Sequence, residues 1–146
     1  MTVVIDASVF NKLFLDEEDS NQAKAFVRSV VIADRAMLAP TLLRLEVCKT
    51  ALHFGLDFAV PLDLLNAHVD AGLRLIDPAD AIWRTAEEIS RTGHGKSGYP
   101  QLEDSLYHAL AIHAEGTFVT ADHRHVAKTE AFGHVTMLSE WQLPSP

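Results

Sequence analysis

Cysteines and long apolar runs are scarce in this chain of 146 residues, and each scarcity excludes a class of protein. A single cysteine, Cys48, rules out an internal disulfide and any metal site built from several cysteines, as is typical of a reducing compartment. No apolar run approaches the length of a membrane span, and the N-terminus lacks the basic-then-apolar order of a secretory signal. We therefore expect a cytoplasmic protein that does not enter a membrane.

Basic residues are also few: 12 Lys and Arg stand against 20 Asp and Glu, which gives a net charge of −8. This balance argues against a protein that coats nucleic acid non-specifically, because phosphate binding needs a basic surface. A nucleic-acid substrate is compatible with this charge if local basic contacts or bound cations neutralise the phosphates. The acidic excess also favours a basic partner, although solubility alone explains many proteins of this charge.

Short apolar runs alternate with helical patterns along the chain, with no linker, repeat or low-complexity segment. Strands are expected at residues 2–5, 37–39, 74–78, 117–120 and 134–138, and helices at 7–15, 21–32, 41–52, 61–73, 80–92, 103–115 and 122–129. Such alternation forms βαβ units and a parallel sheet buried under helices. We expect a single α/β domain over residues 1–146 with a mainly parallel sheet of four to five strands.

Two acidic residues follow expected strands. Asp6 comes at the end of the first strand, and Asp122 comes just after the strand at 117–120. The carboxyl ends of parallel strands meet at one edge of a sheet, and ligands bind outside that edge in open α/β folds. Both carboxylates should therefore lie at the same edge.

Two further acidic residues lie within expected helices. Glu46 falls in mid-helix on an apolar face, where an ionised side chain is costly unless it is paired or holds a metal. Asp104 opens a later helix and shares a face with Tyr107. Glu103 is adjacent, but neighbours on a helix point about 100° apart, so only one of the two can face squarely inward. Asp104 aligns better.

Each carboxylate also has an ordinary structural explanation. Asp6, Asp104 and Asp122 can be helix-start residues whose carboxylates accept backbone N–H groups. Glu46 can be an edge residue that extends its charged end into solvent. One converging site explains all four residues together, whereas the ordinary explanation requires four separate coincidences.

Four carboxylates brought together repel one another, and divalent cations relieve that repulsion. An all-oxygen ligand set favours Mg²⁺ or Mn²⁺ over zinc. Such an ion lowers the pKa of a bound water and can hold a phosphodiester for in-line attack. Zinc binding by His108, His123 and His125 is disfavoured, because the sequence has no second cysteine and no His-Glu-x-x-His pattern.

Four short motifs occur in order along the chain. They are Val3-Val-Ile-Asp6-Ala-Ser8, Arg44-Leu-Glu46-Val47, Leu102-Glu-Asp104-Ser-Leu-Tyr-His-Ala-Leu-Ala111 and Phe118-Val-Thr120-Ala-Asp122. Together they resemble the motifs of PIN domains, most closely those of the VapC-type toxin ribonucleases of bacterial toxin–antitoxin pairs. The resemblance spans essentially the whole chain.

This resemblance implies a three-layer α/β/α fold and an endoribonuclease that hydrolyses RNA phosphodiester bonds with a water activated by Mg²⁺ or Mn²⁺. The metal-binding and catalytic places fall to Asp6, Glu46, Asp104 and Asp122. The polar supporting places fall to Ser8 and Thr120. The resemblance further implies a homodimer, and a hetero-oligomer with a cognate VapB-like antitoxin whose tail occupies the acidic pocket.

Basic and aromatic residues near the expected site offer contacts to RNA. The Gly-rich stretch 93–100 carries Lys96 and Tyr99, which can grip a phosphate and stack a base. Arg124, in the helix at 122–129, can contact the RNA backbone. A surface loop and a solvated helix face also explain these residues. Asn11 follows Ala7 and Ser8 by one turn and can reach the pocket, but an exposed side chain is the preferred expectation.

Two other classes of function stay open. A receiver-like or haloacid-dehalogenase-like phosphotransfer domain would use Asp6 as phosphoacceptor. Receivers, however, need an acidic pair and a strand-end Lys, and dehalogenase-type enzymes need a second Asp where this chain has Ser8. A non-catalytic PIN-like scaffold would only bind a partner, and the retention of all four carboxylates argues against it.

Overall fold

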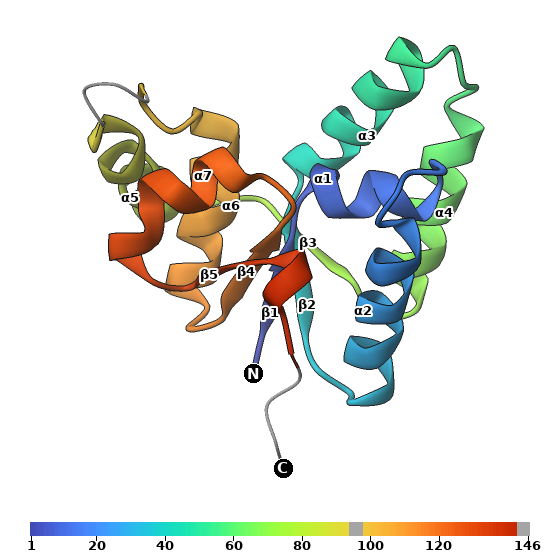
Figure 1. Cartoon of the computed structure of the whole chain (residues 1–146), viewed down its shortest axis with the longest axis horizontal. Helices are drawn as coiled ribbons and strands as arrows, with labels where there is room; N and C mark the ends of the chain where they lie inside the picture. The colour runs from blue at the N-terminus through green and yellow to red at the C-terminus, as the bar shows by residue number, and fades with distance from the viewer. Residues whose placement is uncertain (94–97, 143–146) are drawn as a thin grey trace.

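A five-stranded sheet lies at the centre of the computed structural model, which describes residues 1–93 and 98–142 (Figure 1). Its order is β3-β2-β1-β4-β5, and all neighbouring strands are parallel. The strands are β1 (Val3–Ile5), β2 (Met37–Pro40), β3 (Arg74–Ile76), β4 (Thr117–Thr120) and β5 (Val135–Met137). The α/β class and the parallel sheet expected from the alternating pattern are confirmed.

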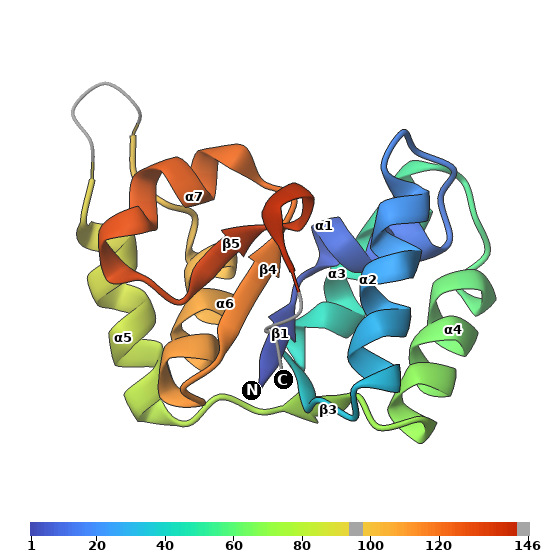
Figure 2. The ribbon, with the colours of Figure 1, turned by 60° about the horizontal axis from the view of Figure 1, so that its bottom comes forward.

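Helices cover both sides of this sheet. Figures 1 and 2 show α5, α6 and α7 gathered on one side, and α1, α2, α3 and α4 on the other. The α-helices are α1 (Ala7–Phe10), α2 (Ser20–Ile32), α3 (Leu42–His53), α4 (Ala59–Asp70), α5 (Asp80–Arg91), α6 (Leu102–His113) and α7 (His123–Thr129). Short 3-10 helices are η1 (Asn11–Leu13), η2 (Glu130–Phe132) and η3 (Leu138–Glu140). Within the described residues, no helix combines the length and apolarity needed to cross a membrane.

The largest departure from the expected elements is the helix at residues 7–15. It ends at Phe10 and continues as the 3-10 turn η1. Lys12 is buried there, and its ammonium group lies 2.6 Å from Glu17 and 2.9 Å from Asp19. The acidic connector at residues 16–19 thus folds back onto Lys12, and the helix is shorter than expected.

The sheet and α6 share the core that supports the site edge. Tyr107 of α6 stacks on Phe118 of β4 with ring centroids 5.9 Å apart, and both side chains are fully buried. Burial of an aromatic side chain of this size contributes about 2–3 kcal/mol. This packing holds α6 against β4. The carboxyl end of β1 lies beside that of β4, because Ile5 pairs with Val119 in the sheet. The start of α6 is therefore close to both strand ends.

Candidate active site

Asp6 lies at the carboxyl end of β1 and is almost completely buried, with 2% of its surface exposed. Both of its carboxylate oxygens accept hydrogen bonds. The Ser8 hydroxyl donates to Oδ1 over 2.6 Å, and the Thr120 hydroxyl donates to Oδ2 over 2.7 Å. The backbone N–H of Val9 also donates to Oδ1, so Asp6 caps α1. These donors offset the cost of burying a carboxylate and hold it in one orientation.

Asp122 occupies the corresponding place after β4. Its Oδ1 accepts the backbone N–H groups of Arg124 and His125, over 2.9 Å and 3.3 Å, and so caps α7. The helix-start interpretation is therefore correct for both Asp6 and Asp122. It does not compete with the shared-edge interpretation, because each of these two strands leads into a helix at that edge.

Ser8 and Thr120 join the two strand ends. Their hydroxyl oxygens lie 3.3 Å apart, and the Ser8 hydroxyl also accepts the N–H of Ala121 over 3.0 Å. The Thr120 hydroxyl accepts the N–H of Asp122 over 3.1 Å. Two hydroxyl groups thus fix the Asp6 carboxylate and the backbone that leads to Asp122 relative to each other.

Glu46 and Asp104 reach the same edge from α3 and α6. Both are half-buried, and together with Asp6 and Asp122 they line one cavity of about 330 Å³. Glu103 is exposed and does not line this cavity, although its negative charge acts on Glu46. The other lining residues are Ala7, Ser8, Asn11, Lys49, Thr50 and Gln101. We call this space the acidic cavity.

Burial, followed by neighbouring negative charges, raises the pKa values of three carboxyl groups of the acidic cavity. Burial, followed by the negative charges of Asp6 and Asp122, raises the pKa of Asp104 to about 8. Burial also raises the pKa of Asp6, although the hydrogen bonds from Ser8 and Thr120 act against it. The pKa of Glu46 is raised by burial as well. Such crowding is relieved either by a retained proton or by a bound cation.

Two buried polar atoms lie beside this cavity, the hydroxyl of Tyr107 and Oδ1 of Asn11. The Tyr107 hydroxyl has the Glu46 carboxylate within reach as an acceptor. Oδ1 of Asn11 lacks a hydrogen-bond partner among the described residues, while the amide nitrogen of Asn11 donates to Thr50 over 2.8 Å. Burial and the nearby Glu46 charge raise the pKa of the Tyr107 hydroxyl, which keeps it protonated. Unpartnered polar atoms next to carboxylates are suitable partners for a water molecule or a hydrated cation.

The ligand set fits a hard divalent cation that keeps part of its water shell. Among residues 1–93 and 98–142, no three Asp, Glu, His or Cys side chains converge closely enough to bind one ion together. Mg²⁺ commonly takes one or two carboxylates directly and fills its other positions with water. Zinc instead needs three or four closely placed protein ligands. The acidic cavity therefore suits Mg²⁺ or Mn²⁺.

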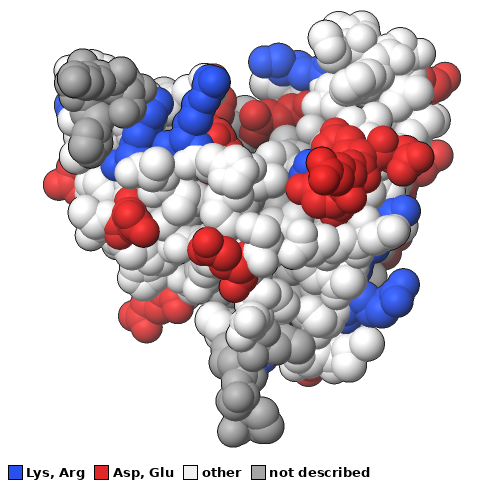
Figure 3. Space-filling view, in the orientation of Figure 1, with Lys and Arg blue, Asp and Glu red and all other residues white. Residues whose placement is uncertain are grey.

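A second cavity adjoins the first. It measures about 420 Å³ and shares Gln101, Asp104 and Asp122 with the acidic cavity. Tyr99 and Arg124, expected from the sequence to contact RNA, both line it. Lys96, the third such residue, lies outside the described residues. Figure 3 shows a hollow with acidic side chains at its floor, and basic side chains over α7 and beside α3 on its two rims.

Sequence reasoning missed part of the cavity lining. Asn11 was expected to be exposed, but it is half-buried and faces the acidic cavity, because the helix ahead of it ends early. Lys49 and Thr50 were overlooked, although their spacing of three and four residues from Glu46 places all three on one helix face. Gln101 carries no signal of this kind, since it precedes α6.

The fold resembles those of several solved structures. PAE2754 from Pyrobaculum aerophilum is 18% identical with a TM-score of 0.61, over 95% of this chain and 90% of that one. VapC20 from Mycobacterium tuberculosis, a Sarcin-Ricin loop cleaving toxin, is 12% identical with a TM-score of 0.65, over 86% and 93%. VapBC2 from Rickettsia felis, bound to a DNA fragment from its promoter, is 11% identical with a TM-score of 0.67, over 94% and 97%. At these identities the likeness concerns the fold alone.

The protein family is assigned from the amino-acid sequence. No curated protein matches it. Residues 3–131, however, match the PIN domain, and this stretch contains β1 to β4, Asp6, Glu46, Asp104 and Asp122. The match agrees with the fold, with the order of the four motifs and with the neighbouring toxin structures. The chain belongs to the PIN domain family.

Proposed function

We propose that this PIN domain is a VapC-like, metal-dependent endoribonuclease that hydrolyses RNA phosphodiester bonds. The observation that carries the proposal is the placement of Asp6, Glu46, Asp104 and Asp122 around one cavity. Burial, together with the negative charges of the neighbouring carboxylates, raises the pKa of Asp104 to about 8. A polyanion can approach such a site only when cations balance the carboxylates.

One or two of these four carboxylates would hold Mg²⁺ or Mn²⁺ directly, and the others would hold it through its water molecules. When bound, the ion lowers the pKa of a water and balances the charge of a phosphodiester. Ser8 and Thr120 keep the Asp6 carboxylate in one orientation, which pre-organises the site. Glu46 lines the cavity from α3, where its carboxylate can accept a proton from the attacking water. The products carry a 5′-phosphate and a 3′-hydroxyl.

Carboxylate-to-amide substitutions test this proposal directly. Asp6→Asn and Asp104→Asn keep the side-chain shape and remove a negative charge. We expect each to lower Mn²⁺-dependent cleavage of RNA by at least about 100-fold. Glu88→Gln is the control, since Glu88 is an exposed carboxylate on α5 that lines neither cavity, and it should cleave like the wild type. Full cleavage by both asparagine variants contradicts the proposal.

The two other classes of function predict different outcomes. A scaffold that only binds a partner would show no heat of Mn²⁺ binding in calorimetry while remaining folded. A phosphotransfer domain would form a stable acyl-phosphate on Asp6 after incubation with acetyl phosphate. The PIN match and the engagement of both Asp6 oxygens by hydroxyl donors argue against phosphotransfer.

The proposed enzyme is the toxin of a toxin–antitoxin pair and forms a homodimer. The acidic cavity complements a basic antitoxin tail, and VapBC2 is a relative in fold that binds promoter DNA. The hairpin of α3 and α4 exposes Leu52, Phe54 and Phe58, a surface suited to a partner. Co-expression with a VapB-like protein should abolish cleavage and yield a hetero-oligomer on gel filtration.

A further inference from the structure

The second cavity differs from the acidic cavity in its chemistry. It is lined by the cations Arg124 and Lys128, by the ring of Tyr99 and by His123, next to the shared carboxylates Asp104 and Asp122. Its volume of about 420 Å³ lies at the small end of ligand sites, which span roughly 300–1,000 Å³. A space of this size admits one nucleotide but not a stack of base pairs.

Tyr99 is held as a platform at the mouth of this cavity. One side of its ring lies against Gly93, so closely that a methyl group at residue 93 would overlap the ring. The residue is nevertheless 68% exposed, which leaves ring surface open to solvent. An aromatic ring that is supported from behind and open in front can stack an unpaired base.

The cations beside this platform are not neutralised by carboxylates. Within the part of the chain that the structure describes, neither Arg124 nor Lys128 forms an ion pair. Both are on α7, one turn apart, so they present two positive charges along one face. Figure 3 places basic side chains at this rim of the hollow. Free cations beside a carboxylate site suit the phosphates that flank a scissile bond.

The two cavities adjoin, because Gln101, Asp104 and Asp122 line both. Lys49 lies on the α3 side of the acidic cavity, the carboxylates lie in the middle, and Arg124 lies in the second cavity on the far side. An extended backbone can therefore contact a cation on each side of the carboxylates. Gln101 lies at the junction, where its amide can both donate and accept hydrogen bonds.

We propose that the second cavity binds one unpaired nucleotide of single-stranded RNA, with its base stacked on Tyr99 and its phosphate beside Arg124 and Lys128. This subsite rests on the proposed function, because it positions the neighbouring phosphodiester over the acidic cavity. The substrate is single-stranded at this position, since a base in a duplex has no free face to give to Tyr99.

Binding measured without cleavage tests the subsite. The probe is a fluorescent, unstructured oligoribonucleotide of mixed sequence and about 12 nucleotides, studied by anisotropy with Ca²⁺ in place of Mg²⁺. Tyr99→Ala should weaken binding by about 5- to 100-fold, and Tyr99→Trp should restore it, because both rings stack. Gly93→Ala should weaken binding without removing any contacting group, since it displaces the ring.

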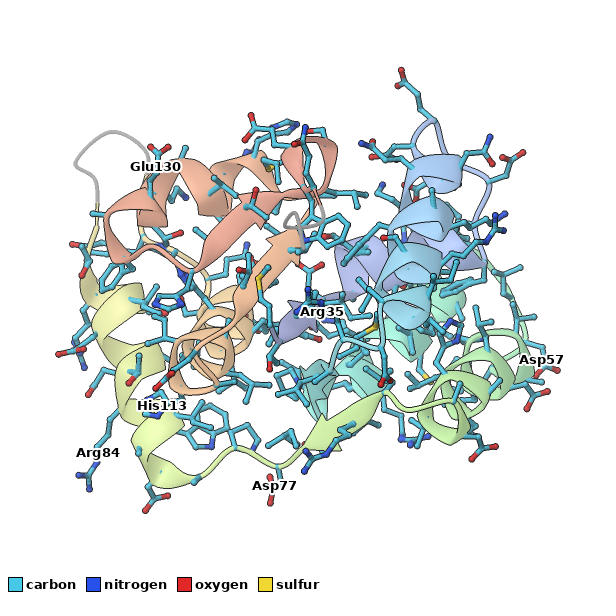
Figure 4. The ribbon with its side chains drawn as sticks, turned by 90° about the horizontal axis from the view of Figure 1, so that it is seen from below. Arg35, Asp57, Asp77, Arg84, His113 and Glu130 are labelled. Carbon is cyan, nitrogen blue, oxygen red and sulfur yellow. The ribbon has the colours of Figure 1, made fainter. Side chains whose placement is uncertain are left out.

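The cations are tested by salt dependence. Arg124→Ala and Lys128→Ala should each reduce the slope of log K against log salt concentration by about 0.7, the value for one single-strand phosphate contact. Arg84→Ala is the matched control, because Arg84 projects from α5 away from the body of the molecule (Figure 4). It should leave both affinity and slope unchanged. On a cleavable RNA, the subsite variants should raise KM and leave kcat within about 3-fold.

The outcomes separate the subsite from the nuclease proposal. Wild-type affinity in both Tyr99→Ala and Arg124→Ala, or equal binding of the probe annealed to its complement, overturns the subsite while cleavage by the wild type stands. Tighter binding of the deoxy version of the probe overturns the assignment to RNA. Weakened binding in these variants, together with no cleavage by the wild type, supports the subsite and overturns the nuclease proposal.

Discussion

His108 of α6 and His125 of α7 are joined by a hydrogen bond, with Nδ1 of His108 lying 3.0 Å from Nε2 of His125. Nε2 of His108 lies 2.7 Å from the carbonyl oxygen of Gly133, which can only accept, so that nitrogen carries the proton. Nδ1 of His108 must then accept from His125. Burial lowers the pKa of both rings, that of His125 to about 4, so both are neutral at pH 7.

This bond ties together the two helices that present Asp104 and Asp122, each about one turn away. His125→Leu leaves a buried acceptor on His108 without a donor, and we expect a loss of about 1–3 kcal/mol in the free energy of unfolding. Mn²⁺ binding should weaken as well. His125→Gln, which keeps a donor at the same reach, should recover both properties. Chemical denaturation measures the free energy of unfolding, and calorimetry measures Mn²⁺ binding. Equal results for the Leu and Gln variants would show that His125 does not position the two helices.

Asp104→Asn should stabilise the metal-free protein even though it removes cleavage. Burial and the charges of Asp6 and Asp122 make the folded wild type hold a proton on Asp104 at pH 7, whereas an amide needs no proton. We expect a gain of about 1–2 kcal/mol in the free energy of unfolding at pH 7. The gain is measured by urea denaturation in the presence of a chelator. A loss of stability would mean that Asp104 is not forced to keep a proton in the folded protein.

The same gain should depend on pH. Asp104 keeps its proton up to about pH 8 in the folded protein but has an ordinary pKa of 3.8 when unfolded. Between these values the unfolded chain binds fewer protons, so this group makes the wild type less stable as pH rises. The difference between Asp104→Asn and the wild type should therefore grow from about pH 4 to about pH 8. Comparing the two proteins cancels the titration of His125, which acts in the opposite direction.

Mn²⁺ binding should strengthen over the upper part of the same range. A cation must displace the proton that Asp104 retains below about pH 8. Calorimetry in buffers of different ionisation enthalpy should detect release of a proton at pH 7 and less release at pH 9. Binding that is independent of pH would show that Asp104 takes no part in holding the ion.

Thr120 is expected to matter through its hydroxyl group rather than its shape. Thr120→Val removes the donor to Asp6 and the acceptor for the N–H of Asp122. The unfolding free energy should fall by about 1–3 kcal/mol and cleavage should be largely lost. Thr120→Ser keeps the hydroxyl and should retain cleavage, with a stability cost near 1 kcal/mol for one lost methyl group. Similar cleavage by the Val and Ser variants would contradict this role.

Local sequence was sufficient to predict most of the helices and strands and part of the candidate site. The alternation of apolar runs and helical patterns predicts parallel βαβ units, and strand ends are marked by the carboxylates themselves. Asp6 and Asp122 could therefore be assigned to one edge from the sequence alone, because parallel strands all end on the same side. Glu46 and Asp104 followed from helix periodicity, which also separated Asp104 from the exposed Glu103.

Only the tertiary structure decided how these residues act together. The raised pKa of Asp104 depends on charges contributed by distant segments, and no window of sequence contains them. The support of Tyr99 by Gly93 and the bond between His108 and His125 likewise depend on backbones brought together by packing. Asn11 lines the cavity from the 3-10 turn that follows α1, which ends at Phe10. Sequence periodicity indicates the secondary structure of each segment by itself. The distances and electrostatic interactions between segments arise only when the chain packs.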